Sequence, residues 1–160
     1  MRLLTGLVLL MACVSACEDV ETLDPHYATP ERTIETMLDA YGLSDVTPEE
    51  GRRLRRAGQL RLRNATAYHA CFEHFDGAGD EALAGYVVGS VVENRDALRT
   101  TITNDKARVM AERGAPVVLY KRRGGWRISL DESVPQPYRG QLLEVARRAR
   151  ERARAQGQFE

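Results

Sequence analysis

The stretch LRTTITNDKARVMAERGAPVVLYKRRGGWRISL, residues 98–130, decides the fold of this chain. It contains four short runs of alternating apolar and polar side chains, separated by the turn residues Asn104-Asp105, Arg113-Gly114 and Gly124-Gly125. Alternation with a period of two is typical of a half-buried β-strand, and turns of two or three residues connect antiparallel neighbours. The stretch therefore predicts an antiparallel meander of four strands.

The alternating side chains indicate where each strand lies. They are Leu98, Thr100 and Ile102, then Ala107, Val109 and Ala111, then Val117 and Leu119, and finally Trp126, Ile128 and Leu130. We expect the last three on the inner face of the sheet. A further short strand is predicted at residues 59–63, where Leu60 and Leu62 alternate with arginines.

Helices are predicted before the meander, because apolar residues recur there at intervals of three and four. The first follows Thr29-Pro30-Glu31, a hydroxyl cap with proline and an acid in the first turn, and it ends at Gly42. The second begins at the capping box of Thr47 and Glu50 and fades near Gly58.

Two more helices are expected before the meander and one after it. Asn64 caps the third, whose apolar face is Tyr68, Cys71, Phe72 and Phe75. The fourth is capped by Asp80 and runs to about Asn94. The last helix follows Pro135 and Pro137, with Leu142, Val145, Ala146, Ala149 and Ala153 facing one way.

Helices gathered before a meander predict an α+β fold. N-terminal helices should pack on one face of a curved antiparallel sheet of four to five strands, and a C-terminal helix should follow. Thr29-Pro30-Glu31 and the closing hairpin, with Gly124-Gly125-Trp126-Arg127-Ile128, resemble the nuclear transport factor 2-like cone, which ketosteroid isomerases and polyketide cyclases also use. The resemblance covers residues 29–131. It implies a cone that can enclose a pocket, but not a particular reaction.

The first sixteen residues have the layout of a signal peptide. Arg2 supplies a positive charge, and an apolar run follows to Val14, softened only by Thr5 and Gly6. A membrane-spanning helix needs about 20 apolar residues, and here acids follow a shorter run directly. A removable signal is therefore favoured over a permanent span.

Val14-Ser15-Ala16-Cys17 resembles the bacterial lipobox, a branched apolar residue and two small residues before an obligatory cysteine. The resemblance implies cleavage before Cys17, a diacylglyceryl thioether on its thiol and usually acylation of the new amino terminus. Cys13 stands in a poorer frame, with bulky Met11 where a small residue is expected. A plain secretory signal cut after Ala16 is the alternative without lipid.

The signal peptide and the lipobox determine the expected domain organisation. We expect a signal peptide at 1–16, a lipidated acidic tether at 17–28, a cone-like domain at 29–131, and a connector with an Arg- and Ala-rich helix at 132–160. The chain has 23 basic and 23 acidic side chains, a net charge of zero, so neither charge nor address favours nucleic acid. Once position 13 is removed and Cys17 carries lipid, Cys71 has no disulfide partner within the chain.

One group of residues invites a metal-site hypothesis: His69, Cys71, Glu73 and His74. On a helix at about 100° per residue, the two histidines lie about 140° apart, and Cys71 lies about 200° from His69. They cannot converge on one ion without ligands from elsewhere, and Cys71 belongs to the aromatic face. We therefore expect no metal and no cofactor.

Catalytic candidates follow from the resemblance alone. The isomerase-like relatives use a carboxylate base facing a tyrosine inside the cone. The carboxylates available are Asp39, Asp96 and Asp105, and the tyrosines are Tyr41, Tyr68, Tyr86 and Tyr120. None stands in a recognisable motif, so no catalytic residue is assigned.

Arginines gather in two groups, Arg52, Arg53, Arg55, Arg56, Arg61 and Arg63, and Arg147, Arg148, Arg150, Arg152 and Arg154. They could contact anionic lipid or another envelope polymer. Charge runs are usually solvated, and Glu144 with Arg148 and Arg147 with Glu151 are favourable i, i+4 pairs. We expect solvated faces balanced by acids.

These observations together predict a bacterial envelope lipoprotein, anchored to a membrane through Cys17 on the periplasmic or outer side. Its domain is expected to bind an envelope protein or a small ligand without catalysis. The alternative is an enzyme that uses the interior of the cone. Carboxylates and a tyrosine in a deep pocket would favour the enzyme, and an interior filled by Leu, Val and Trp126 would favour the binding domain.

Overall fold

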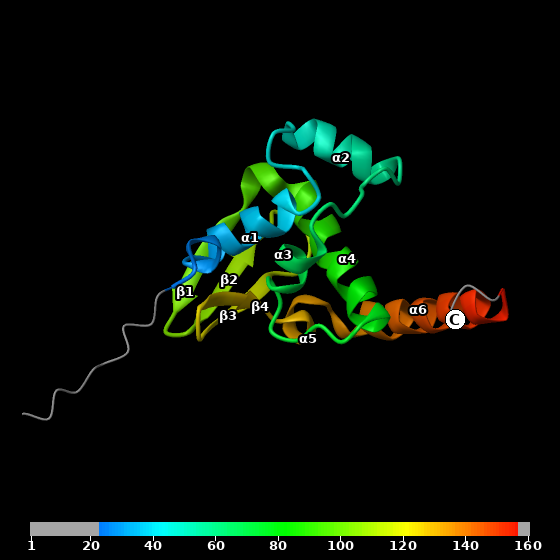
Figure 1. Cartoon of the computed structure of the whole chain (residues 1–160). Coiled ribbons are helices and arrows are strands. Elements are labelled where there is room, and N and C mark those ends of the chain that lie inside the picture. Colours follow the sequence, from blue (N-terminus) through cyan, green and yellow to red (C-terminus); the bar gives the residue numbers. More distant parts are fainter. Residues whose placement is uncertain (1–22, 157–160) are drawn as a thin grey trace, which may run out of the picture.

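The computed structural model describes residues 23–156, which form helices around a four-stranded antiparallel sheet (Figure 1). The helices are η1 (Pro25–Tyr27), α1 (Pro30–Asp39), α2 (Pro48–Arg56), α3 (Ala65–His69), α4 (Ala78–Asn94), η2 (Arg95–Ala97), α5 (Leu130–Ser133) and α6 (Gln136–Ala155). The strands are β1 (Arg99–Thr103), β2 (Lys106–Met110), β3 (Val117–Arg122) and β4 (Gly125–Ile128). The predicted α+β class is confirmed. The signal peptide and Cys17 lie outside the described residues.

The sheet has the predicted meander order β1-β2-β3-β4, with every pair antiparallel. Asn104, between β1 and β2, has a φ of 54°, and Gly124, between β3 and β4, has a φ of 80°. Turn residues with positive φ match the twist of the strands that they join, which explains the tight connections. Ala107, Leu119 and Ile128 are paired across three strands and are all fully buried, so they mark the core face.

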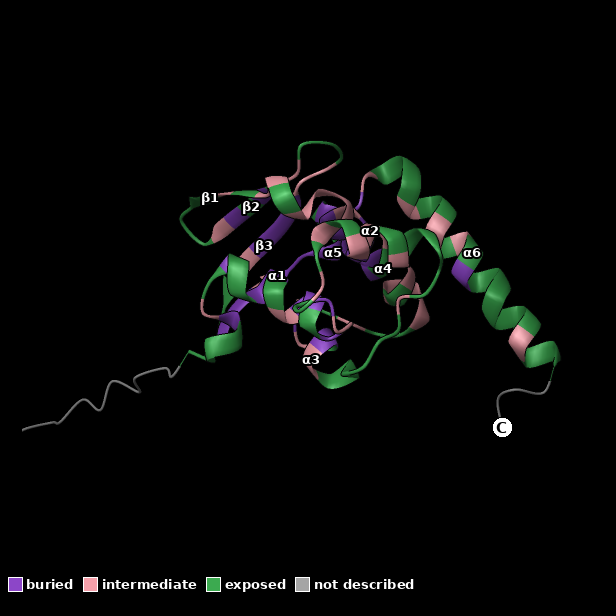
Figure 2. Ribbon diagram, turned by 90° about the horizontal axis from the view of Figure 1, so that it is seen from above, coloured by how far each residue is buried: buried purple, intermediate pink, exposed green. Residues whose placement is uncertain are grey.

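The core lies between this face and the helices (Figure 2). Met37 of α1, Leu119 of β3 and Ile128 of β4 are fully buried within one continuous hydrophobic cluster. Trp126 is 5% exposed and belongs to the same cluster, so its predicted inward orientation is confirmed. The Thr33 hydroxyl of α1 donates to the Trp126 carbonyl at 3.1 Å, which fixes α1 on the sheet.

Capping chemistry starts three helices where the sequence predicts. The side chains of Thr29, Thr47 and Asn64 accept from backbone N–H groups at the starts of α1, α2 and α3. Helix α4 starts earlier than predicted, at Ala78, and Asp80 lies in its first turn, where its carboxylate accepts from the Asp76 N–H at 2.6 Å. A capping side chain accepts from backbone N–H groups that follow it in the helix. Asp80 instead accepts from an N–H group that precedes it, so it is not the cap.

The third helix is shorter than predicted. It ends at His69, and the following chain runs beside the free edge of β4. There the Ile128 N–H donates to the Cys71 carbonyl at 2.7 Å, and the Glu73 N–H donates to the Ile128 carbonyl at 3.0 Å. Pairing with β4 satisfies backbone groups of both segments, so tertiary hydrogen bonds replace the last helical turns.

Residues 59–63 are not a strand, which corrects the prediction of a fifth one. They form an exposed connection between α2 and α3 with no strand beside them. The N–H groups of Arg63 and Asn64 both donate to the carbonyl of Ala40, at 2.7 and 3.2 Å. The alternation of leucine and arginine does not by itself produce a strand here, because the backbone N–H and C=O groups of a strand need a neighbouring strand to pair with.

Leu130 also departs from the prediction. It is buried, but it begins α5 rather than continuing β4. Ser133 of α5 explains the change, because its hydroxyl accepts from the Val118 N–H at 2.9 Å. Helix α5 thereby covers the part of β3 that extends past the end of β4.

The packed part of the chain already includes η1. Tyr27 is 6% exposed, its hydroxyl donates to the Ala67 carbonyl at 3.3 Å, and the Arg127 guanidinium lies 4.0 Å from its ring centroid. Gly125 makes this contact possible: a Cβ atom there would lie 2.3 Å from the Tyr27 carbonyl oxygen. With a φ of 130°, Gly125 also has a backbone conformation that other residues avoid.

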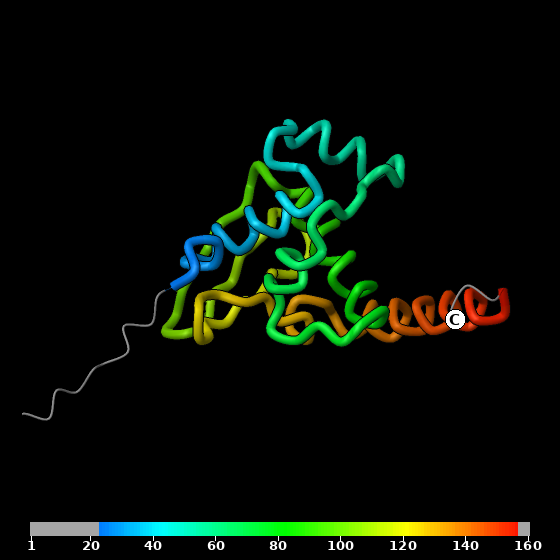
Figure 3. Tube along the Cα trace, in the orientation of Figure 1, coloured from blue at the N-terminus to red at the C-terminus, as the bar shows by residue number. Residues whose placement is uncertain are grey.

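Helix α6 extends away from the body of the molecule (Figure 1), and Figure 3 shows the chain ending on the side opposite its first described residues. Its first half packs on α4, and Ala146 is its only buried residue. Val145 is 65% exposed and Ala149 is also exposed. The prediction of one apolar packing face on α6 is therefore wrong in part. Helix α4 covers the side of α6 that contains Ala146, whereas Val145 stays exposed.

None of the helices in the described part of the chain combines the length and apolar character that crossing a bilayer requires.

Candidate functional site

The space between helices and sheet, where a cone would hold its pocket, is filled with side chains. Leu83 and Val87 of α4 and Trp126 of β4 belong to the same buried cluster as the inner residues of the sheet. A hydrophobic interior packed in this way leaves its lining groups in contact with each other. An interior filled by apolar side chains, rather than a deep pocket with carboxylates and a tyrosine, is the arrangement expected of a binding domain.

The three candidate carboxylates do not point into that interior. Asp39, Asp96 and Asp105 are all exposed. Asp39 accepts a hydrogen bond from Ser44 at 2.7 Å, and Asp96 forms an ion pair with Arg52 at 2.9 Å. The structure therefore does not bring a carboxylate base to the cone interior from these positions.

Of the candidate tyrosines, only Tyr68 is buried. Its ring packs edge-on against Tyr41, with 5.4 Å between centroids, and against Phe72, with 5.1 Å. Burial raises the pKa of Tyr68 far above its ordinary value, with the neighbouring Tyr41 acting in the same direction. A hydroxyl held neutral among aromatic rings is suited to packing.

The residues of the metal-site hypothesis diverge in the structure. Cys71 is fully buried, Glu73 forms an ion pair with Arg122, and His69 stacks on Phe75 at 4.2 Å between ring centroids. His74 is exposed. Within residues 23–156, no three His, Cys, Asp or Glu side chains are grouped to hold a metal ion.

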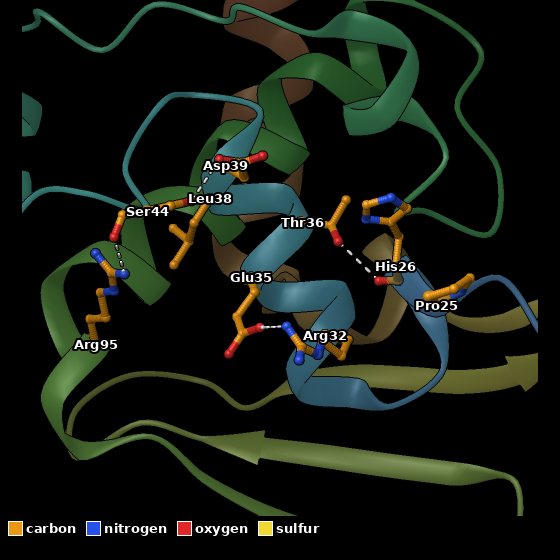
Figure 4. A pocket seen from close by; sticks show the side chains of 9 residues that line it. All are labelled: Pro25, His26, Arg32, Glu35, Thr36, Leu38, Asp39, Ser44 and Arg95. Atoms are coloured by element: carbon orange, nitrogen blue, oxygen red, sulfur yellow. Dashed lines mark hydrogen bonds and ion pairs between the residues drawn. The ribbon is translucent and has the colours of Figure 1, made fainter.

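A surface hollow of about 590 Å³ lies along the outer side of α1 (Figure 4). It is lined by Pro25, His26, Arg32, Glu35, Thr36, Leu38, Asp39, Ser44 and Arg95. The Thr36 hydroxyl donates to the His26 carbonyl at 2.9 Å and ties η1 to α1. Arg95 donates to the carbonyls of Leu43 and Val46, at 2.7 and 3.0 Å, and holds the far wall.

The hollow offers charges of both signs to a ligand. Arg32 and Glu35 form an ion pair at 3.0 Å, with side chains 66% and 61% exposed. An exposed pair of this kind contributes little to stability and is free to exchange partners with a bound group. This arrangement suits a zwitterionic or mixed-charge ligand, or a polar protein surface.

The same hollow lacks the geometry of nucleophilic catalysis. Ser44 donates directly to Asp39, without an imidazole between them. Figure 4 shows Ser44 and His26 on opposite sides of α1, so His26 does not serve Ser44 as a base. In the Ser-His-Asp arrangement an imidazole between serine and carboxylate takes the hydroxyl proton, and Ser44 has no imidazole in that position.

Sequence reasoning found only part of this site. Asp39 is a candidate carboxylate from the sequence alone, whereas no pattern points to His26, Ser44 or Arg95. These residues come from η1, the loop after α1 and η2, and no helical or strand period relates them. Only the tertiary packing of α1 brings them together.

Comparison with protein-family models, with curated proteins and with solved structures finds no match to this chain. The resemblance to the nuclear transport factor 2-like cone and to the lipobox therefore stays a prediction.

Proposed function

We propose that this chain is a bacterial envelope lipoprotein, cleaved after Ala16 and held at a membrane by lipid on Cys17. The observation that carries the proposal is Val14-Ser15-Ala16-Cys17 directly after a short apolar run that begins with one positive charge. Each buried methylene of a lipid chain contributes about 0.8 kcal/mol, so two or three acyl chains give an effectively permanent anchor.

The domain, in this proposal, binds an envelope protein or a small polar ligand and catalyses no reaction. The packed interior and the outward position of Asp39, Asp96 and Asp105 support binding over catalysis. The hollow along α1 is the surface that we assign to the partner. Its residue Pro25 follows Cys17 by eight positions, which corresponds to at most about 30 Å of extended chain. The hollow would therefore face partners close to the membrane.

Replacing the lipidated cysteine tests the anchor. In the full chain expressed in a bacterium, Cys17→Ser removes the only thiol in the lipobox, so the protein should leave the membrane fraction after a high-salt wash and should not incorporate radiolabelled palmitate. Cys13→Ser is the matched control, because it removes a cysteine from the poorer frame, and it should behave as the parent. Equal membrane retention of both variants after the wash would overturn the lipoprotein assignment.

The binding role is tested on the lipidated parent. Gentle solubilisation of membranes, followed by affinity capture and chemical cross-linking, should recover a partner linked to residues of η1 or α1. Cross-links restricted to surfaces far from α1 would contradict the assignment of the hollow.

A further inference from the structure

The outer half of α6 is a helix without a protein partner. Beyond Ala146, its residues are exposed almost without exception, and Figure 2 shows this part extending from the body as an exposed rod. Helix packing usually explains why a helix of this length is stable in a small domain. The outer half, however, contains no buried residue, although Arg150 approaches Gly79 of α4, so packing on the body does not explain its composition.

Its charge is strongly positive and incompletely balanced. Glu144 pairs with Arg147 and Arg148, and Glu151 pairs with Arg147. Three further arginines, Arg150, Arg152 and Arg154, form no ion pair with any described residue. The expectation of a solvated face balanced by acids therefore does not describe this end of α6.

The arginines of α2 provide the contrast. Arg52 pairs with Asp96 at 2.9 Å, Arg53 with Glu50 at 3.3 Å, and Arg55 with Glu93 at 2.7 Å. Three arginines of this first group are thus paired, while Arg56, Arg61 and Arg63 form no ion pair with any described residue. Unpaired arginines therefore occur in both groups, but those of α6 lie together within five residues of one exposed helix.

Exposed apolar side chains accompany this charge. Val145 is 65% exposed, and Tyr138 is 51% exposed although its ring stacks on Tyr86 of α4. With Ala149 they lie within about 40° of one another around the helix, at 100° per residue. Arg148 and Arg152 lie together on one side of this apolar strip. An apolar strip beside arginines is the arrangement of helices that lie in the headgroup region of a bilayer, where guanidinium groups bind phosphate.

A second copy of the chain is a poor occupant for this surface, because two helices with the same excess of arginine repel each other. A bilayer that contains anionic lipid supplies opposite charge across a whole plane and accepts the apolar strip at its edge. We propose that the outer half of α6, residues 147–155, binds the surface of an anionic lipid bilayer. This contact goes beyond the proposed function and does not depend on lipid at Cys17.

The test uses the chain from residue 18 onward, which contains every described helix and strand and lacks the anchor cysteine. Binding to vesicles of phosphatidylcholine with one third phosphatidylglycerol is measured by sedimentation and compared with pure phosphatidylcholine. The parent should bind the anionic vesicles and not the neutral ones, and binding should weaken as salt shortens the range of the interaction. Equal binding to both vesicle types, or none to either, would overturn the proposal.

Two charge variants locate the contact. Arg150→Gln/Arg152→Gln/Arg154→Gln should lower the partition coefficient on the order of 100-fold, since each arginine contributes about fivefold near an anionic surface. The control Arg53→Gln/Arg56→Gln/Arg99→Gln removes the same charge from exposed positions on α2 and β1 and should stay within about threefold of the parent. Equal losses in the two variants would show a net-charge effect and overturn the assignment to α6.

A third variant and a competitor complete the test. Val145→Asp places a carboxylate in the apolar strip and should also weaken vesicle binding, while circular dichroism reports that α6 remains folded. Binding to dextran sulfate without binding to anionic vesicles would overturn the proposal in favour of a polymer partner. A negative result leaves the Cys17 test untouched, because this chain has no anchor and the salt wash in that test removes any contact made by α6.

Discussion

The thiol of Cys71 is enclosed by the protein on all sides. The side chain is fully buried, and its Sγ donates to the Ala67 carbonyl at 3.2 Å. Burial raises the pKa of Cys71 to about 12, because the thiolate would lose its hydration there, while Arg127 acts weakly in the opposite direction. The apolar face of Tyr68, Cys71 and Phe72 was predictable from their spacing, and their burial confirms it.

This burial predicts a loss of stability in alkaline solution. The pKa is about 9 in the unfolded chain and about 12 in the folded one, so between these values the folded state keeps a proton that the unfolded state releases. Stability therefore falls as pH rises through this window, and Cys71 should account for about 1.4 kcal/mol of loss between pH 8 and pH 10.

Urea unfolding of the parent and of Cys71→Ala measures this contribution. Cys71→Ala should be less stable than the parent at pH 8 but should lose less stability between pH 8 and pH 10, because it lacks the buried thiol. The tyrosines titrate in both proteins and contribute equally to both pH profiles. The native parent should also react slowly with a thiol reagent and quickly in denaturant. Parallel pH profiles, or fast native labelling, would mean that the thiol is accessible.

At the scale of elements, strand β4 has partners along both edges. It pairs with β3 on one side, and Phe72 bridges to Ile128 on the other. The four strands were predictable within one or two residues, because side-chain alternation and the glycine turn at Gly124 are local signals. The shortened α3 and the missing fifth strand were not, since each depends on which backbone groups find partners elsewhere in the fold.

Trp126 shows what β4 contributes to stability. Trp126→Ala removes a buried aromatic ring from the main cluster and should cost about 3–5 kcal/mol, a large share of the stability of a domain of this size. Lys121→Ala is the matched control, because Lys121 is the cross-strand neighbour of Trp126 but is exposed. Its change should stay within about 0.5 kcal/mol.

Thermal and urea unfolding of both variants check this prediction. Arg127, the neighbour of Trp126 in sequence, is unsuitable as a control, since its guanidinium covers the ring of Tyr27. Similar losses for the Trp126 and Lys121 variants would mean that the inward side of β4 has been misassigned.

At the scale of the whole molecule, the body ends where α6 leaves α4. Helical periodicity predicted that α6 exists and roughly where it begins, but could not predict which side α4 covers. The hollow along α1 was also beyond sequence reasoning, because His26, Ser44 and Arg95 meet only after the helices pack. Periodic sequence patterns predict helices and strands one by one. Surfaces that several helices form together depend on how those helices pack, which the patterns do not predict.

Removal of residues 152–160 should leave the body intact. The described part of this segment, Arg152 to Gln156, contains no buried residue and forms no ion pair with the remainder of the described chain. We expect the melting temperature to change by at most about 2 °C, while a chain that ends at residue 136 should melt clearly lower because the face of α4 under α6 becomes exposed. Differential scanning calorimetry compares the three proteins, and a large drop for the shorter deletion would contradict the rod-like description of α6.

The contacts of η1 and α1 with β4 also affect when the chain can fold during its synthesis. Tyr27 lies against Arg127, and Thr33 bonds to Trp126, 93 positions later. Contacts between residues so distant in sequence form slowly, since a long loop must close before they stabilise anything. A nascent chain that lacks β4 offers α1 only part of its packing surface, so the complete domain forms only after about four fifths of the chain exist. In the export that we propose for this chain, closing contacts that form so late would keep the domain unfolded for longer.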